Sequence, residues 1–202
     1  MKSIAIFCGS ALGADPIYLR TAQNVGRCLA EKGITLVYGG GRSGLMGVVA
    51  DSALAAGGQV IGVIPQVLVT KELAHPGLTE LHVVENMQQR KSKMSELADG
   101  FVAMPGGVGT LEEIFEQWTW AQLGIHLKPC AFLNVDGFYD DLLKFLSITA
   151  EKGFTHSRFI DHLVVAEHIE TVVEQFQNFV APEPKWGMVE KPELVLELEN
   201  EP

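Results

Sequence analysis

The sequence predicts an α/β protein built on a doubly wound parallel sheet of about seven strands with helices on both faces. Three observations predict this fold. Short apolar runs rich in β-branched residues alternate with longer segments of helical period along most of the chain. Runs such as 4–7 and 60–64 are apolar at nearly every position, as expected for parallel strands that are covered on both faces. The chain has 202 residues, 47% of them hydrophobic, which suits one domain with a substantial core.

Strands and helices are expected to alternate along most of the chain. The strands are expected at residues 3–8, 34–38, 59–64, 81–84, 100–104, 130–134 and 163–166. The helices are expected at about residues 16–32, 45–56, 87–98, 111–123, 138–152 and 169–180. This order implies right-handed crossovers, so the fold is expected to be Rossmann-like. Ligands bind such sheets beyond the carboxyl ends of the strands, which points to loops 9–15, 39–47 and 105–110.

Two segments differ from this alternation. Residues 65–80 form a longer connection than usual, which is interpreted as a lid or a binding loop. From residue 181 onward the sequence turns to proline and glutamate. Residues 1–180 are therefore expected to form the single domain, and residues 181–202 an acidic, mobile tail that Trp186 could pin to a neighbouring surface.

Composition and charge exclude several classes of function. The formal charge of −10 disfavours a nucleic-acid partner, because such binding depends on lysine and arginine. No apolar run has the roughly 18 residues of a membrane span, and the N-terminus lacks the pattern of a signal peptide, so a cytoplasmic protein without membrane contact is expected. The three cysteines form no CxxC pair and the six histidines show no metal-binding spacing, so no metal site is expected.

The loop at 39–47 holds five glycines between a strand and a helix. It satisfies G-x-G-x-x-G, but it follows the second strand and the next strand ends without an acid for a ribose, which disfavours a dinucleotide site. A Walker loop is also disfavoured, because Leu45 stands where lysine is needed. Two interpretations stay open: a tight turn that packs a helix on the sheet, or a close approach of ligand or backbone.

The loop at 105–110 is the stronger signal, because its glycines lie between an apolar strand and an evident helix. Without side chains, its N–H groups can converge on an anion, and the helix start adds roughly half a positive charge. Thr110 could cap this helix and offer its hydroxyl to the same ligand. The sequence therefore predicts that a phosphorylated small molecule binds here.

Glu113 has two interpretations at this stage. The run 110–113 matches a capping box, in which the glutamate reaches back to the backbone N–H of Thr110. The other interpretation is a carboxylate that faces the ligand.

The helix expected at 87–98 places cations near its apolar stripe. Met87, Met94 and Leu97 share that stripe with Arg90 or Lys91 at helical spacing. A solvated charge cluster with packed aliphatic stems would explain this arrangement. Cations on the inward side would instead need a counter-charge, which a phosphate or Glu113 could supply.

Taken together, these motifs resemble the cytokinin riboside 5′-monophosphate phosphoribohydrolase family, the LOG ("lonely guy") proteins, whose members are often labelled lysine decarboxylases. The P-G-G-x-G-T-x-x-E motif stands at 105–113, M-x-x-R-K at 87–91 and Y-G-G-G-x-x-G-L-M-G at 38–47. The stretches 118–124 and 134–139 are also similar. Gln88 departs from the histidine that many members carry.

The resemblance implies that residues 1–180 form a nucleotide-binding catalytic domain. The implied reaction cleaves the N-glycosidic bond of an (N6-substituted) adenosine 5′-monophosphate to free base and ribose 5-phosphate, without a cofactor. Arg90 and Glu113 would be the catalytic pair, in a homodimer whose site lies near the subunit interface. The residues expected to contact the nucleotide are Gly9, Ser10, Gly40, Gly41, Glu72, Met87, Lys91, Gly106, Gly107, Val108, Gly109, Thr110, Leu111, Glu112 and Thr119.

The chemistry suits these residue types. N-glycosidic cleavage passes through an oxocarbenium-like sugar, which Glu113 can stabilise while it orients or deprotonates water. Arg90 is too basic for a general acid and is assigned an electrostatic role. Two alternatives stay open: a non-catalytic carrier of a nucleotide or phosphorylated cofactor, and a lysine decarboxylase. The second would need pyridoxal phosphate on a lysine, and no local feature identifies such a lysine.

Overall fold

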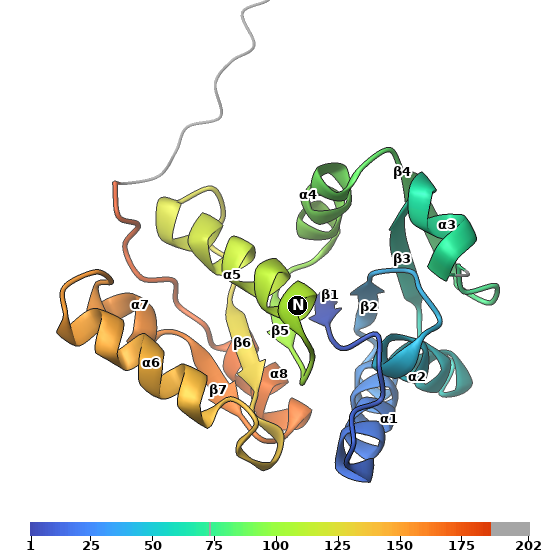
Figure 1. Ribbon diagram of the computed structural model, residues 1–202, viewed down its shortest axis with the longest axis horizontal. Helices are drawn as coiled ribbons and strands as arrows, with labels where there is room; N and C mark the ends of the chain where they lie inside the picture. Colours follow the sequence, from blue (N-terminus) through green and yellow to red (C-terminus); the bar gives the residue numbers. More distant parts are fainter. Residues whose placement is uncertain (73, 187–202) are drawn as a thin grey trace, which may run out of the picture.

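The strands assemble into one parallel sheet in the order β4-β3-β2-β1-β5-β6-β7 (Figure 1). This is a computed structural model, and it describes residues 1–72 and 74–186. The strands are β1 (Ser3–Phe7), β2 (Thr35–Tyr38), β3 (Val60–Pro65), β4 (Glu80–Val84), β5 (Phe101–Ala103), β6 (Cys130–Leu133) and β7 (Val164–Ala166). All six neighbouring pairs are parallel, so the expected fold class and strand alternation are confirmed.

Helices connect the strands on both faces of this sheet. They are α1 (Pro16–Glu31), α2 (Gly44–Ala55), α3 (Gln66–Glu72), α4 (Met87–Leu97), α5 (Val108–Leu123), α6 (Asp140–Glu151), α7 (Ser157–Asp161) and α8 (Ile169–Gln177), with a 3-10 turn at Val135–Gly137. Within the described residues, no helix has both the length and the apolar character that crossing a membrane requires.

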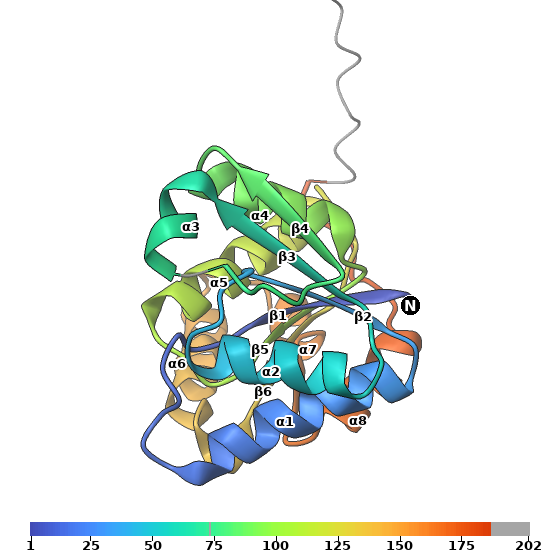
Figure 2. The same ribbon diagram turned by 90° about the vertical axis from the view of Figure 1, so that its right-hand side faces the viewer.

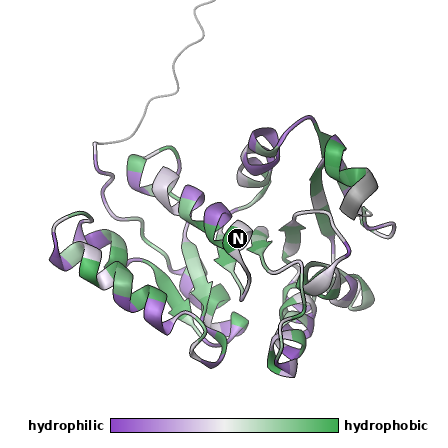
Figure 3. Cartoon of the chain, in the orientation of Figure 1, coloured by the Kyte–Doolittle hydropathy of each residue, from purple (hydrophilic) through white to green (hydrophobic). Residues whose placement is uncertain are grey.

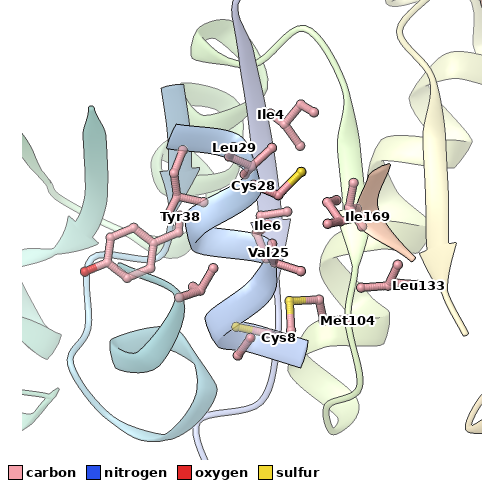
Figure 4. Close-up of a cluster of buried hydrophobic side chains, with 14 of the residues drawn as sticks. Ile4, Ile6, Cys8, Val25, Cys28, Leu29, Tyr38, Met104, Leu133 and Ile169 are labelled. Atoms are coloured by element: carbon pink, nitrogen blue, oxygen red, sulfur yellow. The ribbon is translucent and has the colours of Figure 1, made fainter. Parts of the chain in front are cut away.

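The core consists of two layers, one on each face of the sheet. Figure 2 shows α1, α2 and α8 together on one side of the strands, with α4 on the other. On the first side, Ile4 and Ile6 of β1 pack with Val25 and Leu29 of α1 (Figure 4). The second layer joins β1, β5 and β6 to α4, α5, α6 and α7. Figure 3 shows the strands in hydrophobic colours and many helices striped in both, as expected when each helix buries one face.

Local signals explain where several helices begin and end. The carboxylate of Asp15 accepts a hydrogen bond of 2.8 Å from the N–H of Ile17, and Pro16 opens α1. The side chain of Asn86 caps α4 by accepting from the N–H of Gln89 at 2.9 Å. Gly124 ends α5 with a left-handed φ of 78°.

The structure differs from the expected elements in three places. The segment interpreted as a lid or binding loop contains the helix α3, in which three β-branched residues stand among helix formers and weaken the local helical signal. The short helix α7 was not expected, and α6 begins after the turn at Val135–Gly137 rather than at Phe138. Packing on the sheet, not local propensity, decides these elements.

The C-terminal tail lies mostly outside the described residues, which end at Trp186. Trp186, which could have pinned the tail to a neighbouring surface, has an exposed side chain. The preceding residue, Lys185, is held instead through its backbone, which donates to the carbonyl of Gln122 at 2.8 Å.

The strand order also identifies the crevice of the sheet. The chain moves outward from β1 to β4 and then returns to place β5 on the other side of β1. The loops after β1 and β5 therefore diverge in opposite directions, and such a switch point is where open α/β sheets bind ligands. These two loops start at Cys8 and Met104.

Candidate active site

A cavity of about 290 Å³ opens at this switch point, beyond the carboxyl ends of β1 and β5. Helices α4 and α5 lie side by side there, and cross-helix ion pairs join them (Figure 1). The residues that line the cavity are Cys8, Gly9, Ser10, Met46, Met87, Arg90, Gly107, Val108, Gly109, Thr110, Glu112 and Glu113. Its size is in the lower range of small-molecule sites.

The start of α5 forms one wall of the cavity. Gly107 is the N-cap residue, and no side chain bonds the first N–H groups of the helix. Gly107 and Gly109 leave open space where a Cβ would stand. An uncapped start of a 16-residue helix, with bare glycines at its mouth, can hold an anion such as a phosphate.

The capping-box interpretation of Glu113 is wrong. Because α5 begins at Val108, Thr110 and Glu113 are the third and sixth helical residues. Thr110 is buried against the loop instead of capping the helix. Glu113 is therefore too far along α5 to reach an N-cap N–H, and its carboxylate faces the cavity and Arg90.

Arg90 is buried at the cavity wall, and its guanidinium is held by backbone carbonyls. Its Nε donates to the carbonyl of Val63 at 3.1 Å and its Nη2 to the carbonyl of Gly39 at 3.0 Å. Its Nη1 lies 3.6 Å from Oε1 of Glu113. Arg90 is thus the cation of α4 that points inward, and of the two counter-charges expected for it, a phosphate or Glu113, the structure places Glu113 beside it.

The environment of Glu113 favours its protonated form. Burial is the larger influence and raises the pKa of this carboxyl to about 7, against the opposing charge of Arg90. A carboxyl poised near neutral pH suits proton transfer and charge stabilisation, and such groups cluster at functional sites. Burial and the charge of Glu113 also raise the pKa of the neighbouring Cys8 thiol, which is thus kept uncharged.

Lys91 lies beside the cavity, between two acids of α5. Its Nζ donates to Glu116 at 2.9 Å and to Glu112. Burial alone would lower the pKa of Lys91, but the hydrogen bonds and charges of these two glutamates raise it. Lys91 thereby neutralises acids that flank Glu113 and would otherwise repel an anionic ligand.

Several other residues expected to contact the nucleotide do not line this cavity. Gly40 lies against the segment after α3, where its carbonyl accepts from the N–H of His75 at 3.0 Å. Gly41 pairs with Ala74 in an isolated β-bridge. Leu111 packs in the core, and Thr119 is exposed further along α5. Helix α3 ends at Glu72, whose side chain lies outside the described part of the structure.

Two residues at the cavity were not expected there. Met46 follows the glycine loop, and Cys8 both packs in the core and lines the cavity. The position of Cys8 at the end of the first strand could have indicated this. A second cavity of about 270 Å³ adjoins the first through Gly9, Ser10 and Gly107, and its wall includes Gly106 and the side chains of Tyr18 and Phe138.

The arrangement combines an anion site with a carboxyl near its pKa and a fixed cation. Such a set can hold a phosphate at the helix start and stabilise positive charge on an adjoining sugar. Within residues 1–72 and 74–186, no three histidine, cysteine, aspartate or glutamate side chains gather as metal ligands would.

Comparison with protein families gives two kinds of similarity. A family model described as "Possible lysine decarboxylase" matches residues 46–176. The chain is 47% identical over 178 residues to the cytokinin riboside 5′-monophosphate phosphoribohydrolase of Rhodococcoides fascians, covering 88% of this chain and 90% of that protein. It is 43% identical over 188 residues to the cytokinin riboside 5′-monophosphate phosphoribohydrolase LOG of Oryza sativa subsp. japonica, covering 93% and 77%.

Solved structures share the fold at lower identity. The molybdenum cofactor binding protein from the phototrophic bacterium Rippkaea orientalis superposes with a TM-score of 0.66 at 22% identity, covering 88% of this chain and 96% of that chain. At this identity the likeness concerns the fold alone.

Proposed function

Because this chain belongs to the family of cytokinin riboside 5′-monophosphate phosphoribohydrolases, we propose that it hydrolyses the N-glycosidic bond of N6-substituted adenosine 5′-monophosphates. The products are the free base and ribose 5-phosphate. The observation that carries the proposal is the pair Arg90–Glu113, 3.6 Å apart, at the wall of a cavity that also holds the uncapped start of α5.

The 5′-phosphate is assigned to the start of α5. The N–H groups of the first turn and the helix dipole favour a phosphate monoester with a charge near −2. Glycines at Gly107 and Gly109 let the phosphate approach the backbone. Binding energy from this remote group then fixes the ribose over the carboxylate further along α5.

Glu113 and Arg90 act at the sugar. As the bond from C1′ to the base breaks, positive charge develops on the ribose, and the carboxylate of Glu113 stabilises it. The same carboxylate orients the attacking water and accepts its proton, which a pKa of about 7 permits at neutral pH. The electron pair of the broken bond stays on the base, which takes up a proton from solvent and leaves as the neutral free base, and Glu113 then returns its proton to solvent. Arg90 cannot release its proton, so it stabilises the ionised form of Glu113 and orients the carboxylate.

A homodimer with the site near its interface is part of the same proposal. The family resemblance implies a nucleotide contact for Thr119, which lies exposed on α5 and does not line the cavity of its own subunit. A contact between Thr119 and a nucleotide would therefore involve a second subunit. The proposed compartment is the cytoplasm, which the three buried thiols Cys8, Cys28 and Cys130 support.

Product analysis tests the proposed reaction. The purified protein is incubated with adenosine 5′-monophosphate, its N6-prenylated form and the matching nucleosides, and free base and ribose 5-phosphate are quantified. Turnover is expected with the nucleotides and a large loss with the nucleosides, because the phosphate anchor is missing.

The matched variant is Glu113→Gln, which keeps the side-chain size. We expect a 10²- to 10⁴-fold loss of turnover, roughly the range for a lost acid–base group. Nucleotide binding without any turnover by the parent protein would favour a carrier. Carbon dioxide release from lysine with pyridoxal phosphate would favour the decarboxylase that the family model's description names.

A further inference from the structure

We propose that Gly39, in the loop after β2, is a positioning residue for this reaction: its missing side chain leaves the space that the guanidinium of Arg90 occupies. The inference rests on the proposed function. It assigns a role in the reaction to a glycine outside the loop that holds the phosphate.

Arg90 depends on groups from two neighbouring strands for its orientation. Its Nε donates to the carbonyl of Val63 in β3, and its Nη2 donates to the carbonyl of Gly39 just beyond β2. Because these two nitrogens bind carbonyls, Nη1 is the nitrogen that faces the cavity. It lies 3.6 Å from Oε1 of Glu113 and 3.8 Å from the sulfur of Met87. The planar guanidinium is thereby held in one orientation at the cavity wall.

The backbone conformation does not explain the glycine at position 39. Gly40 and Gly44 in the same loop have φ values of 77° and 56°, where a side chain would be strained, whereas Gly39 is not among the glycines with positive φ. A Cβ at Gly39 would overlap Nη2 of Arg90 and stand 3.1 Å from its Cζ. Arg90 is therefore what excludes a side chain at this position.

A methyl group at position 39 would push the guanidinium off its carbonyls. Arg90 is buried, so it has little room to keep both hydrogen bonds after such a shift. Its distance and angle to Glu113 would change, and its charge would lower the pKa of that carboxyl less. The protein would then need a higher pH to ionise Glu113.

Gly39→Ala is the direct test, with kcat and KM measured across pH 5 to 9. We expect kcat to fall roughly 10- to 100-fold, the range for a misplaced catalytic group. The midpoint of the rise in kcat with pH should move upward from its parent value, with little change in KM. A parent-like kcat and an unshifted pH profile would contradict the inference.

The matched control is Gly26→Ala, at the contact between α1 and α2. A Cβ at Gly26 would overlap the carbonyl of Val49 and stand 2.8 Å from the nitrogen of Ala53, and none of these three residues lines the cavity. This variant should lower the melting temperature while leaving the pH profile unchanged. A shifted profile in the control would show that any packing defect produces the effect, which would overturn the inference.

A double-mutant cycle with Arg90→Ala tests the geometry without any enzyme assay. Once the guanidinium is removed, the methyl of Gly39→Ala has room, so adding it should leave the melting temperature unchanged or raise it. In the parent background the same substitution should lower it. Equal losses in both backgrounds would contradict the inference.

If Gly39→Ala alone does not fold, a folded double variant supports the inference and an unfolded one contradicts it. Failure of the proposed function is distinguishable from failure of this inference. A parent protein without hydrolase activity would refute the function, whereas the thermal cycle would still test whether Gly39 makes room for Arg90.

Discussion

Glu113 shows that a side chain can be placed where its ionisation destabilises the folded protein. The carboxyl is 12% exposed and has Arg90 within 3.6 Å, yet burial prevails and raises its pKa to about 7. The folded protein thus holds a proton that the unfolded chain would release near 4.5. Ionising Glu113 at neutral pH lowers the free energy of unfolding, a common consequence of placing a residue for chemistry.

The first prediction concerns stability. Between pH about 4.5 and about 7 the native state binds more protons than the unfolded chain, so Glu113 makes the free energy of unfolding fall as pH rises. A glutamine side chain cannot ionise, so Glu113→Gln should be more stable than the parent at pH 8 by roughly 1–3 kcal/mol and about equal at pH 4. Urea unfolding at both pH values measures this. Glu151→Gln, at an exposed site, is the control and should show no such difference.

The second prediction concerns the pH dependence of activity. If the ionised carboxylate of Glu113 is the reacting form, kcat should rise as pH increases through about 7 and level off above it. The nucleotide phosphate titrates near pH 6, so its own ionisation is followed separately by phosphorus NMR. A kcat that is flat from pH 6 to 8.5, or that falls over that range, would be incompatible with this role.

Much of the placement of Arg90 and Glu113 could be predicted from the sequence. The motifs identified Arg90 and Glu113 as a pair, and helical spacing placed a cation on the inward side of the helix. Spacing could not decide between Arg90 and Lys91, because adjacent residues differ by only about 100° around a helix. The carbonyls of Val63 and Gly39, which are distant in sequence, select Arg90.

Among the helices and strands, the start of α5 decides the chemistry of the site. The sequence suggested that Thr110 caps the helix, but the helix already begins at Val108. Its first N–H groups therefore stay available for a ligand, and Glu113 moves to the second turn. Local capping signals cannot show which of several starts the chain adopts, because the adjoining glycines Gly107 and Gly109 permit more than one.

The third prediction tests this helix start with Gly109→Ala. A Cβ at Gly109 meets no atom within 4 Å, so the fold should tolerate it, with a gain of up to about 1 kcal/mol from helix propensity. The methyl would project where the phosphate approaches the backbone, so KM for the nucleotide should rise about tenfold while the melting temperature is kept. An unchanged KM would place the phosphate elsewhere. Gly77→Ala, which also has room for a Cβ, is the control.

In the fold as a whole, the order of the strands creates the site. Because β5 lies beside β1, the loops after these two central strands separate and leave a crevice beyond the carboxyl ends of the strands. Cys8, Gly9 and Ser10 from the loop after β1 then line one cavity together with Gly107 and the first two turns of α5. The overall charge of −10 is compatible with the proposed anion site, because the partial charge of the helix start and the charge of Arg90 act locally.

The fourth prediction concerns assembly. If Thr119 contacts a nucleotide held by a second subunit, sedimentation equilibrium should give twice the chain mass of 22.0 kDa. Thr119→Arg should then weaken nucleotide binding or dimerisation without lowering the stability of the monomer fold, because the side chain is exposed. A monomeric protein with full activity would show that one subunit holds a complete site.

The alternation of strands and helices and the glycine loop at 105–110 before a helix could both be obtained from the order of residues. These features depend on patterns within a few turns of chain, which local physics controls. Three others emerged only in the folded chain: α5 starts uncapped, Glu113 is buried enough to titrate near neutral pH, and Arg90 is the cation beside it. The burial of Glu113 and the orientation of Arg90 depend on atoms brought together from different strands and helices, which no local pattern encodes. The start of α5 depends on which of the starts permitted by Gly107 and Gly109 the folded chain adopts.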